Sequence, residues 1–106
     1  MISSRVVTTA LLVDDQPASL SANQRRLERE GYSVAAAQNV ADALSQARRS
    51  APNVIFVHLV ATGLGSLSLI QALRSDDGCR HIPVVLITDH ADRRLGQKLH
   101  SVPREG

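Results

Sequence analysis

The chain has 106 residues, which is the size of one small globular domain covering 1–106 with a single core. Apolar residues make up 43% and charged residues 21%, and these ordinary values exclude a disordered or collagen-like chain. Twelve cationic and ten acidic side chains give a net charge of +2, too small a surplus to favour nucleic acid or a membrane surface.

The apolar segments are too short for a membrane-spanning helix, which needs about 20 residues. The first residues have neither the long apolar core nor the cleavage site of a secretory signal, so we expect a cytoplasmic protein. A single cysteine, Cys79, excludes an intrachain disulfide and a thiolate metal cage.

Strand and helix patterns alternate through the first half of the chain. An apolar strand ends at the acidic pair Asp14-Asp15, and a helix is predicted over 17–30, followed by Gly31 at a left-handed cap position. Residues 32–36 alternate as a short strand. Asn39 then resembles a helix cap, and apolar residues follow it at helical spacing.

The second half repeats this order. A strand is predicted over 54–60, a helix with Ser66 as its N-cap, a second continuous apolar strand over 82–88, and a last helix over 93–101 whose apolar face includes Val102. Four strand-then-helix units predict an α/β fold, a parallel sheet with helices on both faces.

In proteins with an open parallel sheet, ligands bind at the carboxyl ends of the strands. Asp14 and Asp15 lie there after the first strand, His58 near the end of the third and Thr88 at the end of the fourth. Paired carboxylates suit Mg²⁺, although an isolated Asp-Asp pair can equally cap the following helix.

The order and spacing of three segments resemble the receiver (CheY-like) domain of two-component response regulators. The segments are LVDDQP at 12–17, PNVIFVHLVATGLG at 52–65 and IPVVLIT at 82–88. The resemblance implies a flavodoxin-like, doubly wound sheet of order 2-1-3-4-5. It also implies a signalling role, in which a third-strand Asp accepts phosphate from a partner kinase.

The resemblance assigns roles to five positions. Asp14 and Asp15 match the metal-binding pair, Val60 the position whose backbone carbonyl completes the Mg²⁺ site, and Thr88 the switch hydroxyl. His58 stands where the family has its phosphoacceptor Asp. An uncharged nitrogen donor is a poor ligand for Mg²⁺, so metal binding and phosphate acceptance are both expected to weaken, and no cofactor is expected.

Three interpretations of His58 remain open. The histidine fills a former acidic pocket as a hydrogen-bonded partner of Asp14 or Asp15, it binds a transition metal with one of them and His90, or it is itself phosphorylated. The first predicts a receiver that does not depend on phosphorylation.

The family's fifth strand, its Lys-Pro pair and its last helix have no counterpart in this sequence. The fourth strand then becomes an apolar edge, and we expect a second copy, a rearranged C-terminal segment or a partner protein to cover it. The residues expected at this interface are Val84, Val85, Leu86, Ile87, Leu95 and Leu99.

The sequence therefore predicts an atypical receiver domain, C-terminally truncated relative to the family, that acts through protein-protein contacts or dimerisation and is not an enzyme. The alternative within signalling is a receiver switched by metal or by phosphate on His58. A small flavodoxin-like enzyme is the alternative of another class, but the sequence has no nucleotide-binding fingerprint and no nucleophile-base pair.

Overall fold

The computed structural model describes residues 7–59, 64–88 and 100–102. Three helices and five strands lie in these ranges, none of the helices being long and apolar enough to span a membrane. In chain order the elements are β1 Thr9–Val13, α1 Pro17–Arg29, β2 Ser33–Ala37, α2 Val40–Ser50, β3 Val54–Leu59, α3 Leu64–Ser75, β4 Val84–Thr88 and β5 His100–Val102.

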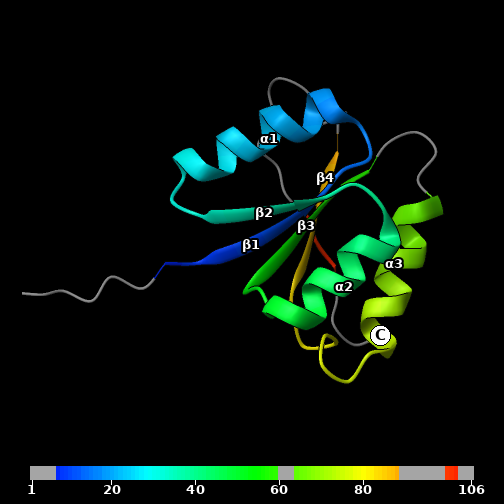
Figure 1. Ribbon diagram of the computed structural model, residues 1–106. Coiled ribbons are helices and arrows are strands. Elements are labelled where there is room, and N and C mark those ends of the chain that lie inside the picture. Colours follow the sequence, from blue (N-terminus) through cyan, green and yellow to red (C-terminus); the bar gives the residue numbers. More distant parts are fainter. Residues whose placement is uncertain (1–6, 60–63, 89–99, 103–106) are drawn as a thin grey trace, which may run out of the picture.

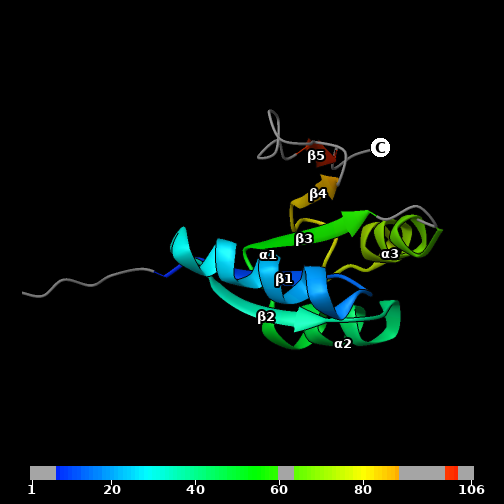
Figure 2. The same ribbon diagram turned by 90° about the horizontal axis from the view of Figure 1, so that it is seen from above.

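The strands form one sheet in the order β2-β1-β3-β4-β5, and the first four run parallel. Figures 1 and 2 show α1 on one face of the sheet and α2 with α3 on the other. This confirms the predicted flavodoxin-like fold with order 2-1-3-4. The register places His58 of β3 opposite Ile87 of β4, so the carboxyl ends of the two strands lie at the same edge of the sheet.

Alternation along the strands builds an apolar layer on each face of the sheet. Under α1, Leu20 and Leu27 pack against Leu12 and Phe56. The larger layer under α2 and α3 contains, among others, Leu11, Val13, Ala43, Ala47, Ile55, Val57, Leu69, Leu73 and Cys79. The two layers place β1 and β3 in the centre of the sheet and fix where their ends lie.

Helix ends follow the sequence signals at two of three sites. The Asn39 side chain accepts the Asp42 backbone N–H at 2.8 Å, and Gly31 has a φ of 104°, a value that favours glycine. The prediction of Ser66 as an N-cap is wrong, because α3 begins at Leu64 and Ser66 lies inside the helix. Leucine has a high helix propensity, which allows the helix to include Leu64 and to begin about one turn earlier.

The predicted last helix over 93–101 does not reach its expected end, and 93–99 lie outside the described residues. Residues 100–102 form β5, antiparallel to β4, with Val102 opposite Val84 and His100 opposite Leu86. The helical spacing of Val102 is overridden because the fourth strand offers a row of unpaired backbone groups, for which a β-branched residue in extended conformation is well suited.

One of the three expected covers of the fourth-strand edge is therefore present. A rearranged C-terminal segment, β5, occupies the edge along 84–86. The side chains of Val84 and Ile87 are buried, whereas Val85 and Leu86 are only partly buried. Leu95 and Leu99 lie outside the described residues.

An ion pair joins α2 to the turn after α3. Arg48 Nε donates to Asp76 Oδ2 at 2.7 Å, and the backbone N–H of Gly78 donates to Asp76 Oδ1 at 2.9 Å. The Arg48 hydrogen bond, followed by that of Gly78, lowers the pKa of Asp76 below its ordinary value of 3.8. The carboxylate thereby holds the turn that leads into β4.

Asp76→Asn tests this link through its pH dependence. Because the folded-state pKa of Asp76 is lowered, its carboxylate stabilises the fold above pH 3.8, and this contribution is lost as the pH falls through the folded pKa. We expect a lower urea midpoint than wild type near neutral pH, and a difference between the two midpoints that narrows as the pH falls below 3.8.

Asp77→Asn is the matched control, because the Asp77 side chain is 95% exposed and its oxygen lies 3.8 Å from Arg80. Its urea midpoint is expected to follow wild type at every pH. A gap between Asp76→Asn and wild type that does not narrow as the pH falls below 3.8 would contradict the assignment.

Candidate functional site

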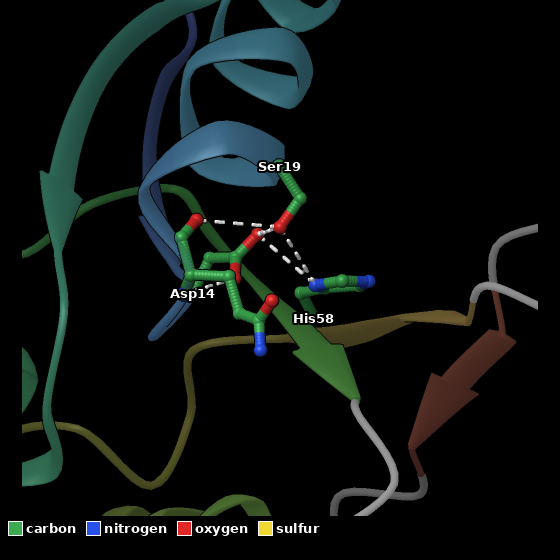
Figure 3. Close-up of polar contacts among 4 residues, drawn as sticks. Asp14, Ser19 and His58 are labelled. Atoms are coloured by element: carbon green, nitrogen blue, oxygen red, sulfur yellow. Dashed lines mark hydrogen bonds and ion pairs between the residues drawn. The ribbon is translucent and has the colours of Figure 1, made fainter.

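The carboxyl end of the sheet brings together three polar side chains from three elements. Asp14 directly follows β1, Ser19 lies in the first turns of α1, and His58 belongs to β3 (Figure 3). β1 and β3 are paired neighbours, so residues 44 positions apart in the sequence meet at this edge. We call Asp14, Ser19 and His58 the Asp14 cluster.

Asp14, which follows β1, and His58 of β3 form an ion-pair contact. His58 Nδ1 lies 3.0 Å from Asp14 Oδ2, and the side chains are 4% and 0% exposed, respectively. Charged or polar groups are stable at this depth only when they are paired, since burial removes their water. The histidine therefore supplies the partner that Asp14 needs.

Ser19 is the third member of the cluster. Its Oγ lies 2.6 Å from Asp14 Oδ2 and 3.4 Å from His58 Nδ1, as the dashed lines in Figure 3 mark. A distance of 2.6 Å is typical of a hydroxyl that donates to an ionised carboxylate. Asp14 Oδ2 is thus held by a hydroxyl and an imidazole together.

The other oxygen of Asp14 serves the start of α1. The backbone N–H of Gln16 donates to Asp14 Oδ1 at 2.9 Å, while the side chain of Gln16 makes no cap hydrogen bond. A carboxylate at a helix N-terminus satisfies a free N–H group and complements the helix dipole. Both oxygens of Asp14 consequently have donors from the protein itself.

The structure describes the other predicted site residues only in part. Asp15 is exposed, in contrast to the fully buried Asp14. Thr88 ends β4 opposite Leu59, at the same edge of the sheet. Val60 and His90 lie outside the described residues, so their predicted roles are not described by the structure.

The donor set does not fit the Mg²⁺ site of the resemblance. Among the described residues no three His, Cys, Asp or Glu side chains are grouped as metal ligands would be. Mg²⁺ requires oxygen ligands in near-octahedral geometry. Here one carboxylate already has a donor on each oxygen, and its nearest titratable neighbour is an imidazole.

Sequence reasoning identified Asp14 and His58 but not Ser19. A serine in the first turns of a helix is an ordinary residue, and nothing in its neighbours indicates a contact across the sheet. Its spacing of five residues from Asp14 becomes informative only when α1 is known to begin at Pro17 and β1 to pair with β3.

Asp14→Asn tests the buried pair. The amide keeps an oxygen for Gln16 but loses the charge opposite His58, and we expect the free energy of unfolding to fall by about 3 kcal/mol. Asp15→Asn is the matched control at the exposed neighbouring position, with an expected change within about 0.5 kcal/mol. Equal effects of the two substitutions in chemical denaturation would contradict the assignment.

Comparisons with known proteins show the family and the fold of this chain. The family model described as the response regulator receiver domain matches residues 10–102. The response regulator PleD of Caulobacter vibrioides is 36% identical over 78 residues, which are 74% of this chain and 17% of PleD. Protein PilH of Pseudomonas aeruginosa is 32% identical over 78 residues, 74% of this chain and 64% of PilH.

A solved structure adds the fold. The chemotaxis response regulator CheY4 of Vibrio cholerae matches with a TM-score of 0.68 and 21% identity, over 76% of this chain and 68% of that chain. The chain spans less than two thirds of the length of the two curated relatives. With a family model covering 10–102 and a sheet of matching order, the chain belongs to the family of response regulator receiver domains.

Proposed function

We propose that this receiver domain acts without accepting phosphate at the third-strand position, and that it signals through contacts with other proteins. The single observation that carries the proposal is the 3.0 Å contact between His58 Nδ1 and Asp14 Oδ2. Receiver domains interact with protein partners in two-component systems, so contact without phosphate keeps the general role of the family.

Charge explains why phosphate acceptance is lost. A phosphoacceptor Asp would be both the nucleophile and an anionic ligand of the cation that neutralises the phosphoryl group. His58 supplies neither a carboxylate nucleophile nor an anionic ligand for a cation. Its ring lies against Asp14 Oδ2, the oxygen that a cation would need. The Asp14 cluster is therefore held in a single arrangement, whereas a site that is switched by phosphate needs two alternative arrangements.

The arrangement of the Asp14 cluster also argues against nucleophilic catalysis. The Asp14 cluster contains a hydroxyl and an imidazole, but the imidazole nitrogen nearest to Ser19 is the one that faces the carboxylate. A nucleophilic serine needs a base nitrogen free to take its proton, with the carboxylate on the opposite ring nitrogen. We therefore propose a signalling domain and not an enzyme.

The β4–β5 edge is the proposed contact surface. β5 is the last strand of the sheet in the described structure and covers only 84–86 of β4. Val85 and Leu86 keep partly exposed side chains beside it. An edge strand with apolar neighbours is suited to strand addition by a second copy or by a partner protein.

Incubation with acetyl phosphate and Mg²⁺ tests the loss of phosphate acceptance. We expect the wild-type chain to show no phosphoryl adduct by intact mass spectrometry, because His58 offers no carboxylate and Asp14 is engaged. A stable adduct that maps to His58 would overturn the proposal in favour of a phosphorylated histidine.

His58→Asp tests the charge argument from the other direction. The variant adds a carboxylate next to Asp14, and we expect its Mg²⁺ affinity in calorimetry to exceed wild type at least about tenfold. His58→Asn, which has the same shape without the charge, is the control and is expected to stay near wild type.

Solution mass over a dilution series tests self-association through the edge. A second copy on the β4–β5 edge predicts a mass that decreases from dimer to monomer as the chain is diluted. A folded monomer at every concentration would exclude self-association through this edge.

A further inference from the structure

We propose that Ser19 is a positioning residue, which orients the Asp14 carboxylate and keeps a hydrogen on Nδ1 of His58. The inference rests on the proposed function, because it explains what maintains the arrangement that excludes phosphate. Ser19 lies on a different element from either partner, and its hydroxyl is the one group in the cluster within 3.5 Å of both.

The hydrogen atoms of the cluster can be assigned from its distances. The Ser19 hydroxyl has a single hydrogen and two acceptors, Asp14 Oδ2 at 2.6 Å and the Gln16 carbonyl at 3.3 Å. The shorter contact to a carboxylate is the stronger one. Ser19 therefore donates to Asp14, and it has lone pairs but no hydrogen left for His58.

His58 must then be the donor on its Nδ1 side. Its Nδ1 faces Asp14 Oδ2 at 3.0 Å and Ser19 Oγ at 3.4 Å, two oxygens that can only accept. A lone pair on Nδ1 would repel both. The imidazole is consequently in the Nδ1–H form, whether the ring is neutral or charged, and in the neutral ring the lone pair is on Nε2.

Ser19 acts on His58 through Asp14 as well as directly. The Gln16 backbone N–H holds only Oδ1 of the carboxylate. The Ser19 hydroxyl fixes Oδ2, the oxygen that faces the imidazole, and so sets the rotation of the carboxylate. Without this hydroxyl the carboxylate keeps one fixed oxygen and can turn away from the ring, and Nδ1–H then exchanges more readily with water.

Figure 3 shows the consequence for the ring. The Nδ1 atom points toward Asp14 and Ser19, and the second nitrogen lies on the opposite side of the ring. Two neighbours on the Nδ1 side hold the ring in one orientation, which a single carboxylate contact does less well. Ser19 thus belongs to the set of residues that decides what the third-strand position can do.

Nitrogen-15 NMR of the full chain tests the proposal, since correlations within the ring distinguish Nδ1–H from Nε2–H. We expect Nδ1–H in the wild-type chain. Ser19→Ala should make this hydrogen exchange with water at least about tenfold faster, the loss expected for a hydrogen bond to a charged group. Ser19→Thr, which keeps the hydroxyl, should restore slow exchange.

Ser21→Ala is the matched control, because Ser21 is an exposed serine on the same helix. Its exchange rate should equal that of wild type. Ser19→Cys, which keeps the volume but is a weak donor, replaces Ser19→Ala if the alanine variant does not fold, and the same faster exchange is expected.

Two results would overturn the proposal: an Nε2–H tautomer in the wild-type chain, or equal Nδ1–H exchange in wild type and Ser19→Ala. Neither result decides the proposed function, which fails if acetyl phosphate with Mg²⁺ leaves a phosphoryl group on wild-type His58. Running both measurements on the same samples separates a failure of the Ser19 assignment from a failure of the phosphate argument.

Discussion

The buried contact between Asp14 and His58 is the interaction on which the site depends. It joins the ends of β1 and β3, the two central strands of the parallel part of the sheet, and both side chains are almost completely shielded from water. Burying an unpaired carboxylate at this depth costs free energy, so Asp14 needs a partner within the site. In this chain the imidazole of His58 and the hydroxyl of Ser19 are the partners of that carboxylate.

Asp14 also links the site to the start of α1. One oxygen accepts the Gln16 N–H and the other holds Ser19 and His58. A change that moves the carboxylate therefore affects the first turn of the helix and the imidazole together. In structural terms, the site and α1 are one unit, which is why the helix needs no side-chain cap from Gln16.

Most of the fold could be predicted from sequence because its signals are local. Asn39 caps α2 and Gly31 adopts a positive φ, as their residue types indicate. The alternation of strand and helix patterns predicts a parallel sheet, and the resemblance to receiver domains implies its order of 2-1-3-4. The topology also predicted that Asp14 and His58 lie at one edge. β5 could not be predicted in this way, because three residues carry no period and their pairing depends on the free edge of β4.

Ser19 marks the other limit of sequence reasoning. Its role depends on a contact with a residue 39 positions away, and no pattern around it differs from that of an ordinary helix. A family resemblance points to the positions that the family uses, and Ser19 is not one of them. Because His58 stands where the family has its phosphoacceptor Asp, the side chains that hold His58 in place can be found only from the structure of this chain.

The direction of β5 has a consequence for how the molecule is connected. His58 is level with Ile87, near the carboxyl end of β4, whereas Val102 is level with Val84 at the amino end. The offset of three residues between Val84 and Ile87 corresponds to about 10 Å along the strand. A parallel strand in the same place would end at the side of the sheet where His58 lies. The antiparallel β5 ends at the opposite side, next to Val84. Any effect of the Asp14 cluster on groups near Val102 therefore has to be transmitted along the length of the strands.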